Sequence, residues 1–264
     1  MTKRTFILFL FIVTLFAFTE DAPPQLKHTN HRAFQGGEKL TYSVAFSIFS
    51  AGIAHITVKD TSLQSRKVMH LKMKGVTTGL ADVIYKVRDS YESFTDIDTD
   101  MPVKAIRNIR EGGYKYYNEV IYNRDSSTVI SKRSGVKAVP ENTLDILSAF
   151  FYGRNHYFND SLKEGEIISF ITYFSDKEFP LKIKYEGIET IRTPIGKVEC
   201  YKFAPVTEIG RTFESNEDMH LWISRDNNRL PIKIKFELIV GSFTCTIQKY
   251  EGLKYSLTSL KNKR

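Results

Sequence analysis

Apolar and polar residues alternate along most of the chain. From Leu40 to Ile48 every second residue is apolar, and small or polar residues fill the positions between. A period of two is typical of a strand with one buried face. The same alternation returns at residues 54–58, 69–73, 103–110, 116–122, 181–185 and 232–238. Segments at this regular spacing predict roughly ten strands of a sandwich or barrel.

The polar face of these segments carries Lys, Thr, Ser and Glu, which indicates an antiparallel sheet with one face in water. Ala51-Gly52 is predicted to form the bend of the first hairpin, and Gly112-Gly113 the turn after the 103–110 strand. We therefore expect a mainly β fold, either a curved antiparallel sheet or an open barrel.

Residues 143–152 break the alternation, because their apolar residues recur at helical spacing. Asn142 or Thr143 can cap this helix, Asp145 complements its dipole, and Gly153 suits its end. A helix that is apolar over most of its girth is a buried one. We expect it to lie in the hollow of the sheet or to plug one end.

The N-terminus has the composition of an export signal. Lys3 and Arg4 precede an apolar run over residues 6–18, which Asp21, Pro23 and Pro24 end. The run is short for a membrane-spanning helix, so a signal peptide over residues 1–19 is predicted, with an uncleaved anchor as the alternative. After it we expect a flexible lead-in over 20–33, a single β domain over 34–255 and a tail over 256–264.

The net charge bears on the class of partner, and the positions of the two cysteines bear on whether they form a disulfide. The chain has 38 basic and 30 acidic residues, and basic residues remain in excess without the predicted signal peptide. Export makes nucleic acid an implausible partner, and charge spread over many strands is typical of a solvated face. Cys200 and Cys245 both lie in apparent strands with two other strands between them in sequence, which favours free thiols over a disulfide.

Several short motifs occur in an order that resembles one protein family. Residues 34–42 read Phe-Gln-Gly-Gly-Glu-Lys-Leu-Thr-Tyr, residues 51–54 read Ala-Gly-Ile-Ala, and the 143–150 segment contains Asp-Ile-Leu-Ser-Ala. Near the end, Leu-Trp-Ile-Ser-Arg-Asp at 221–226 precedes Arg-Leu-Pro at 229–231. This set resembles the bacterial domain-of-unknown-function family 3108 over residues 34–252. The resemblance implies an exported β protein of the cell envelope, and it carries no catalytic residues.

The sequence lacks the common catalytic and cofactor motifs, including the nucleophile elbow, the zinc-protease helix and the phosphate-binding loop. Asp96, Asp98 and Asp100 imitate the start of a calcium loop, but Met101 and Arg107 stand where that loop needs Gly and Glu. We therefore predict no enzyme activity, no metal and no cofactor.

Three residues are candidates for a ligand or partner surface. Glu38 follows two glycines and precedes the clearest strand, where a turn could aim it inward; a charged residue at the sheet edge is the alternative. Trp222 and His220 fall on the face opposite Met219, Leu221 and Ile223, so they could line a groove. A Trp covered by a loop is the structural alternative.

Two functions remain open at this point. The first is a binding module for an apolar ligand such as lipid, held in the hollow of the sheet. The second is a protein-interaction factor in envelope assembly, acting through a sheet edge or the Trp222 face. In either case we expect the protein in the periplasm, or at the periplasmic face of the outer membrane, of a Gram-negative bacterium.

Overall fold

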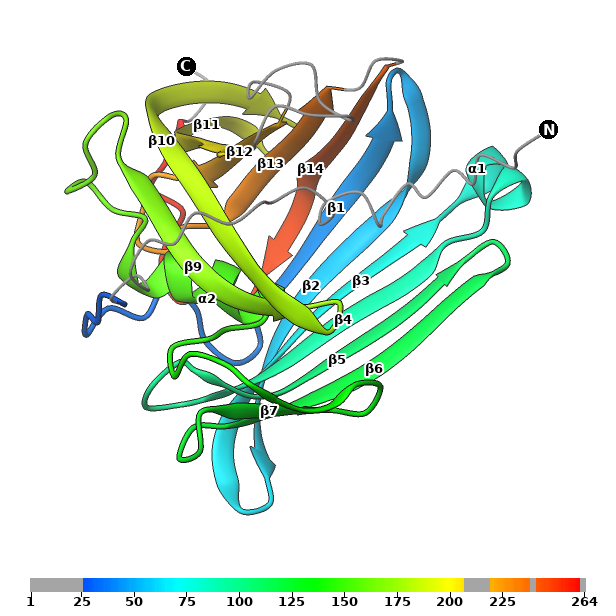
Figure 1. Ribbon diagram of the computed structural model, residues 1–264. Helices are drawn as coiled ribbons and strands as arrows, with labels where there is room; N and C mark the ends of the chain where they lie inside the picture. The colour runs from blue at the N-terminus through cyan, green and yellow to red at the C-terminus, as the bar shows by residue number, and fades with distance from the viewer. Residues whose placement is uncertain (1–25, 207–218, 238–240, 262–264) are drawn as a thin grey trace.

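The computed structural model describes residues 26–206, 219–237 and 241–261. Within these ranges the chain forms one antiparallel sheet of fifteen strands, which curves around the longer of two helices (Figure 1). The predicted mainly β fold is confirmed. The predicted count of roughly ten strands is too low, because short strands contain too few alternating positions to be recognised.

The helices are α1 (Gly79–Ile84) and α2 (Ile146–His156). The strands before α2 are β1 (Lys39–Phe46), β2 (Phe49–Leu63), β3 (Arg66–Thr77), β4 (Arg88–Asp96), β5 (Pro102–Glu111), β6 (Tyr114–Asn123), β7 (Thr128–Ser131) and β8 (Gly135–Ala138). The strands after α2 are β9 (Ile167–Phe174), β10 (Lys177–Thr193), β11 (Gly196–Pro205), β12 (Met219–Ser224), β13 (Pro231–Glu237), β14 (Ser242–Glu251) and β15 (Leu260–Lys261).

The strand order is that of two meanders joined in the middle of the sheet. It runs β8-β7-β6-β5-β4-β3-β2-β1-β14-β13-β12-β11-β10-β9, with β15 beside β11. The sheet stays open, because β8 and β9 are its two edges and do not pair. Side chains join these ends instead: Tyr173 of β9 packs with Val120, Tyr122 and Val129 of β6 and β7.

The first hairpin turns four residues earlier than the sequence suggested. β1 ends at Phe46, and Ser47 takes a left-handed conformation with φ 52°. Gly52 lies inside β2, where an added Cβ would come within 2.2 Å of the Val76 carbonyl oxygen. The glycine is therefore required by the close approach of β3. Ile48, expected to face the core, lies at the hairpin tip and is 89% exposed.

Helix α2 begins and ends later than predicted. Its N-cap is Asp145, whose carboxylate accepts hydrogen bonds from the backbone N–H groups of Leu147 and Ser148 at 2.9 and 3.0 Å. Leu144 cannot be helical, because its backbone pairs with β9. The helix also continues through Gly153, where a Cβ would lie 2.6 Å from the Phe158 ring. Helix propensity alone could not reveal either contact.

A fully buried ion pair fixes α2 to the start of the sheet. The Arg154 guanidinium donates to the two carboxylate oxygens of Glu38 at 2.7 and 2.9 Å, and neither side chain is exposed. Arg154 also donates to the Asn228 carbonyl oxygen at 2.9 Å and lies about 5 Å from the Phe34 and Phe151 rings. The glutamate preceding β1 therefore holds the helix inside the sheet.

The domain extends beyond the boundaries that the sequence suggested. In the expected flexible lead-in, Ala33 is buried and donates to the Asn155 side chain at 2.8 Å. In the expected tail, Leu260 and Lys261 form β15 against β11. Neither segment has a periodic pattern that would have predicted this packing. The predicted signal peptide lies outside the described residues.

The cysteines are free, as predicted. Cys200 is on β11 and Cys245 on β14, and β12 and β13 lie between those strands. This is the arrangement that the order of the apolar segments indicated.

Candidate functional site

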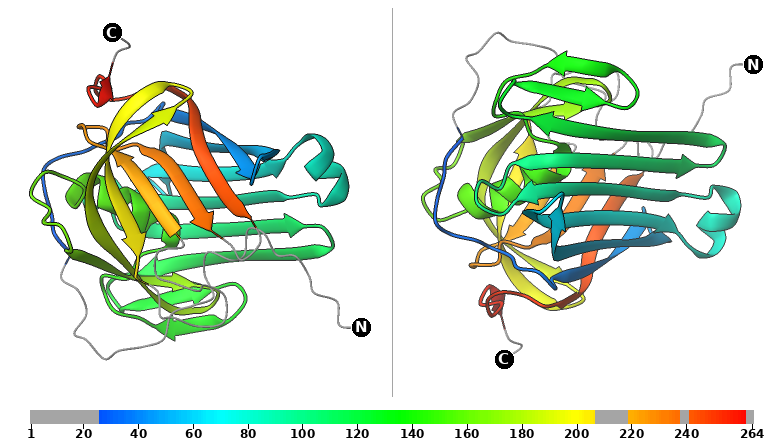
Figure 2. Two further views of the ribbon diagram at one scale, coloured as in Figure 1. Left: turned by 90° about the horizontal axis from the view of Figure 1, so that it is seen from above. Right: turned by 90° about the horizontal axis from the view of Figure 1, so that it is seen from below.

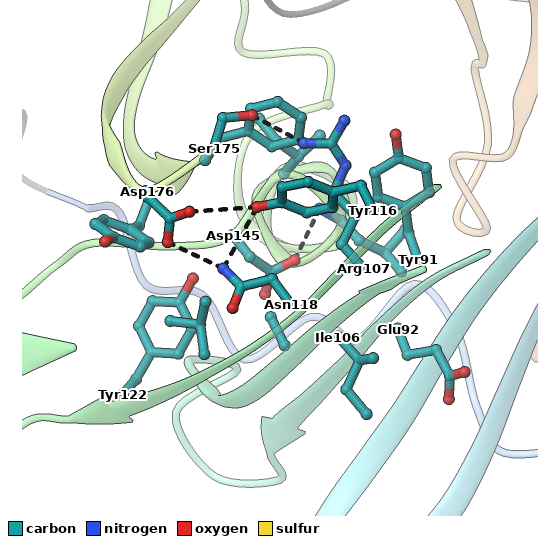
Figure 3. Close-up of a pocket in the computed structure, with 16 residues that line it drawn as sticks. Tyr91, Glu92, Ile106, Arg107, Tyr116, Asn118, Tyr122, Asp145, Ser175 and Asp176 are labelled. Carbon is teal, nitrogen blue, oxygen red and sulfur yellow. Dashed lines mark hydrogen bonds between the residues drawn. The ribbon is translucent and has the colours of Figure 1, made fainter. Parts of the chain in front are cut away.

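A cavity of about 50 Å³ lies inside the curved sheet, beside the start of α2 (Figure 3). Its walls come from the inner faces of β4, β5 and β6, the first turn of α2, and the turn between β9 and β10. A water molecule takes up roughly 30 Å³ in the liquid, so the cavity has room for a small polar group. It is too small to enclose a whole drug-sized ligand, which needs roughly 300 Å³ or more.

Arg107 of β5 brings a buried positive charge to this cavity. Its guanidinium donates to the Ser175 hydroxyl at 2.8 Å and lies 4.7 and 4.3 Å from the centres of the Tyr116 and Phe174 rings. The residue is only 8% exposed, and its Nε and second terminal nitrogen have no hydrogen-bond partner among the described residues. Because arginine stays charged in proteins, the described chain leaves this buried charge only partly satisfied by hydrogen bonds.

Asp176 follows Ser175 in the turn, and hydroxyl and amide donors hold its carboxylate. Ser131, Ser134 and Asn118 donate to one of its oxygens at 2.5–3.0 Å. Burial alone would raise the pKa of Asp176, but these hydrogen bonds lower it below its ordinary value. The carboxylate is therefore charged at neutral pH and is stabilised by these donors.

Asp145 lies on the other side of the cavity, at the start of α2. Besides capping the helix, its carboxylate accepts a hydrogen bond from the Ser93 hydroxyl of β4 at 2.6 Å. Burial raises the pKa of Asp145, and the hydrogen bonds from Ser93 and Ser148 oppose that shift. The contacts of Asp145 thus link α2 to β4, which is a structural role.

Farther along the same inner face, Asp89 of β4 and Glu111 of β5 form a buried carboxyl pair. Each residue is 1% exposed, and one Asp89 oxygen accepts a hydrogen bond from the Arg110 backbone N–H at 2.9 Å. Burial raises the pKa of Asp89, although hydrogen bonds from Arg110 and Glu111 and the charge of Arg107 oppose the shift. A hydrogen bond between two carboxyl groups requires a proton, so this pair retains one at a higher pH than an exposed acid does.

We expect Asp89→Asn to stabilise the protein at pH 7 to 8, as measured by urea unfolding between pH 4 and 8. A carboxyl group with a raised folded pKa favours the fold below its unfolded pKa of about 4, and that contribution is lost as the pH rises through the folded pKa. The asparagine keeps the acceptor for Arg110 and has no charge to bury. The gain over wild type should therefore shrink as the pH falls.

Asp82 provides a control of opposite sign. Its half-buried carboxylate is hydrogen bonded to Arg88, which lowers the pKa of Asp82 to about 2. Asp82→Asn should therefore weaken the fold at pH 7. Equal stability of Asp89→Asn and wild type between pH 4 and 8 would contradict a raised pKa of Asp89.

An apolar inner wall lies in the hollow of the sheet, and its Tyr91 also lines the cavity. Alternation places the strand residues of this wall on the same faces as the buried core, and Phe150 comes from α2; each of these residues is partly exposed. The inner wall consists of Phe46, Met73, Tyr91, Phe150, Ile234 and Cys245. These side chains therefore pack against the core while part of each stays in contact with solvent.

The three residues predicted from the sequence lie away from this cavity. Trp222 is buried and donates to a Glu189 carboxylate oxygen at 3.1 Å, while its ring stacks with His220 at 5.6 Å. His220 lies 3.4 Å from Glu186. Glu38 is separate from both, in its ion pair with Arg154. The structure thus brings Trp222 and His220 together, and it gives Trp222 and Glu38 partners inside the protein.

Arg107 could have been found from its position in the pattern. The inner face of β5 reads Val103, Ala105, Arg107, Ile109, so a cation occupies a core-facing position. Asp176 had no comparable signal, because its donors come from β6 and from the segment around β7.

No described residues form a group of three or more potential metal-binding side chains. The imitation of a calcium loop at 96–100 instead makes internal contacts: Asp96 accepts hydrogen bonds within its turn, and Asp100 accepts them from Asn155 and His156. None of the helices in the described ranges has the length and apolarity needed to cross a membrane.

Comparison with solved structures identifies a shared fold. The chain is similar to the crystal structure of a beta-barrel-like protein of the domain of unknown function DUF1849 from Brucella abortus, with a TM-score of 0.51 and 5% identity. That match covers 81% of this chain and 96% of the other. A second match, to the hypothetical protein CT021 from Chlamydia trachomatis, has a TM-score of 0.38 and 8% identity over 87% of this chain and 94% of that one. No curated protein matches the sequence.

The family comparison agrees with the motifs in the sequence. The model described as "Protein of unknown function (DUF3108)" matches residues 41–248, which include the Ala-Gly-Ile-Ala, Asp-Ile-Leu-Ser-Ala and Leu-Trp-Ile-Ser-Arg-Asp motifs. The match covers most of the chain and lies within the 34–252 range of the resemblance. The chain therefore belongs to the DUF3108 family.

Proposed function

We propose that this protein is a non-catalytic binding module of the bacterial cell envelope, and that its ligand is apolar with an anionic group, such as a lipid. The observation that carries the proposal is Arg107, a buried cation at the cavity with two nitrogens that lack partners in the described chain. Leaving such donors unsatisfied costs roughly 1–3 kcal/mol each, so a site of this kind favours a ligand that accepts from them.

Because the cavity is small, only the anionic group of the ligand fits inside it, and the apolar part lies outside. The cavity holds a carboxylate or phosphate-like group, which guanidinium groups bind in a bidentate manner. The apolar part extends along the inner wall, where Phe46, Met73 and Phe150 are still partly exposed. Burial of a hydrocarbon chain against these residues would supply most of the affinity, at roughly 0.8 kcal/mol per CH₂ group.

Binding is favoured over catalysis by the state of the nearby acids. The oxygens of Asp145 accept hydrogen bonds from the helix and from Ser93, and Asp176 is held by three side-chain donors. Both carboxylates are thus held by partners within the protein. A general acid or base would instead need to face a substrate.

The proposed location follows from the N-terminal segment. Its basic start and short apolar run support export across the inner membrane, and thus a place in the periplasm or at the periplasmic face of the outer membrane.

The test is the identity of what the protein carries when it is isolated from the envelope of the producing bacterium. Extraction followed by mass spectrometry should find an acidic amphiphile in stoichiometric amount with the wild type. Arg107→Gln should lose the amphiphile, because the neutral glutamine amide cannot replace the charged guanidinium and its N–H donors. Arg110→Gln is the matched control, since Arg110 is the next arginine on β5 and is exposed.

The two variants distinguish the proposal from nonspecific adsorption. Retention of the amphiphile by Arg107→Gln, or its absence from the wild type, would refute the proposed role of this cavity. Equal loss from both variants would assign the lipid to the charged exterior.

One observation favours the second function, an interaction factor in envelope assembly. Strand β8 is an edge of the sheet, all four of its residues are exposed, and Val136 is one of them. An exposed edge can pair with a strand of another protein. A photocrosslinking residue at Val136 should then trap one recurrent envelope protein, and the same group at exposed Ile188 of β10 should not. Identical products from both positions would count against it.

A further inference from the structure

Five large apolar residues are exposed together at one end of the molecule. Ile48 and Phe49 form the tip of the β1–β2 hairpin, and Leu80, Val83 and Ile84 belong to α1; all are 68–89% exposed. The Thr78 N–H before α1 donates to the Ala51 carbonyl oxygen of β2 at 3.2 Å, so the two elements adjoin. Both views in Figure 2 show strands β3 to β6 extending past α2 to the end that carries α1. We call these five residues the apolar tip.

The apolar tip is unusual for a surface in water. Helix α1 has only six residues, and none of them is buried. So short a helix is not stable by itself, and its apolar side chains gain little from the contacts in this structure. Single exposed apolar residues are common, whereas a cluster of this kind marks an interaction surface.

Basic side chains surround the tip. Lys86 follows α1, Arg110 and Lys115 flank the turn between β5 and β6, and Lys74 lies near the end of β3. All four are exposed, and none forms an ion pair with another described residue.

The acids of this region do not cancel that charge. Asp82 of α1 is paired with Arg88 at 2.6 Å, and Glu237 beside the β1–β2 hairpin is paired with Lys235, whereas Asp89 and Glu111 are buried inside the sheet. The described surface at this end is therefore apolar at its centre and positive at its margin.

We propose that the apolar tip docks into the surface of an anionic lipid bilayer. Apolar residues enter the boundary between headgroups and acyl chains, while nearby lysines and arginines contact lipid phosphates. A second copy of the chain fits this surface less well, because a symmetric contact would bring the same cations together. The inference is independent of the ligand proposal, although Phe46 of the inner wall lies at the end of β1 next to the tip.

A local fluorescent probe can test docking in the full-length protein. A polarity-sensitive dye is attached at Val83→Cys, or at Ile188→Cys on β10 as the matched control. The native thiols react slowly, because burial raises the pKa of Cys200 and raises that of Cys245 to about 12. Vesicles of phosphatidylglycerol and phosphatidylcholine are compared with vesicles of phosphatidylcholine alone.

Docking predicts a blue shift for the dye at position 83 on anionic vesicles, a smaller one on neutral vesicles, and none at position 188. Ile48→Ser combined with Phe49→Ser should weaken the interaction roughly tenfold or more, since two large apolar groups no longer enter the bilayer. Arg107→Gln should leave it unchanged, which separates docking from ligand binding.

Three results would overturn the proposal. One is an equal shift at both dye positions, which would indicate adsorption through the N-terminal segment or the whole surface. Another is an equal shift with neutral vesicles. The third is a shift at position 83 that depends on protein concentration without vesicles, which would assign the tip to a second copy of the chain.

Discussion

Glu38→Gln is expected to destabilise the protein by about 3–5 kcal/mol, because it leaves Arg154 charged and fully buried without its carboxylate. The pair makes two hydrogen bonds between α2 and the residue that precedes β1, and the Asn228 carbonyl oxygen can satisfy only part of the guanidinium. Urea unfolding at neutral pH measures the loss as a lower midpoint with an unchanged slope.

A double variant separates the ion pair from general disruption. Glu38→Gln combined with Arg154→Met removes both charges, so it should recover a large part of the lost stability. Glu251→Gln is the surface control: Glu251 pairs with Lys249 where both are exposed, and no measurable change is expected there. A double variant whose loss of stability equals or exceeds the sum of the two single losses would contradict a favourable pairwise interaction between Glu38 and Arg154.

The strand pattern was predictable because it is local. Alternation from Leu40 to Phe46 depends on which side chains face the core, and that information is complete within the strand. The hairpin turn was misplaced for the opposite reason. Gly52 looked like a bend in sequence, whereas its conformational requirement comes from the backbone of β3, more than twenty residues away.

The same distinction applies to the charged residues. Glu38 was predicted to be aimed inward or to lie at an edge, but its partner Arg154 is 116 residues away, and no local rule connects them. The Asp145 cap was hidden by Leu144, which appeared to extend the helix and instead pairs with β9. The candidate site could not be predicted without the strand order, because β5, α2 and the β9–β10 turn are far apart in sequence and meet only in the folded structure.

Among the three buried arginines of the described residues, Arg154 and Arg107 differ in one respect that bears on function. Arg154 has a bidentate carboxylate and a carbonyl oxygen, so its charge is compensated within the chain. Arg107 has one hydroxyl and aromatic rings, and two of its nitrogens lack partners among the described residues. A structural role explains Arg154 completely, whereas the hydrogen bonds of the described chain satisfy only part of the Arg107 guanidinium, whose charge also opposes the rise in the pKa of Asp89.

Arg107→Met is therefore expected to separate binding from stability. Without ligand, the variant should be as stable as the wild type or more stable by about 1–2 kcal/mol, because an apolar side chain replaces a buried charge with unsatisfied donors. The cation–π contacts with Tyr116 and Phe174 are lost, which limits the gain. Binding should weaken roughly 100-fold, the effect of removing two charge-assisted hydrogen bonds.

Calorimetric titration with laurate, dodecyl phosphate and methyl laurate measures this effect below the critical micelle concentration. The wild type should bind the two anions and bind the neutral ester weakly, while Arg107→Met should bind all three with similar low affinity. Saturating laurate should also raise the unfolding midpoint of the wild type and leave that of the variant unchanged. A destabilised Arg107→Met that binds laurate as tightly as the wild type would make Arg107 a structural residue and remove the basis for an anionic ligand.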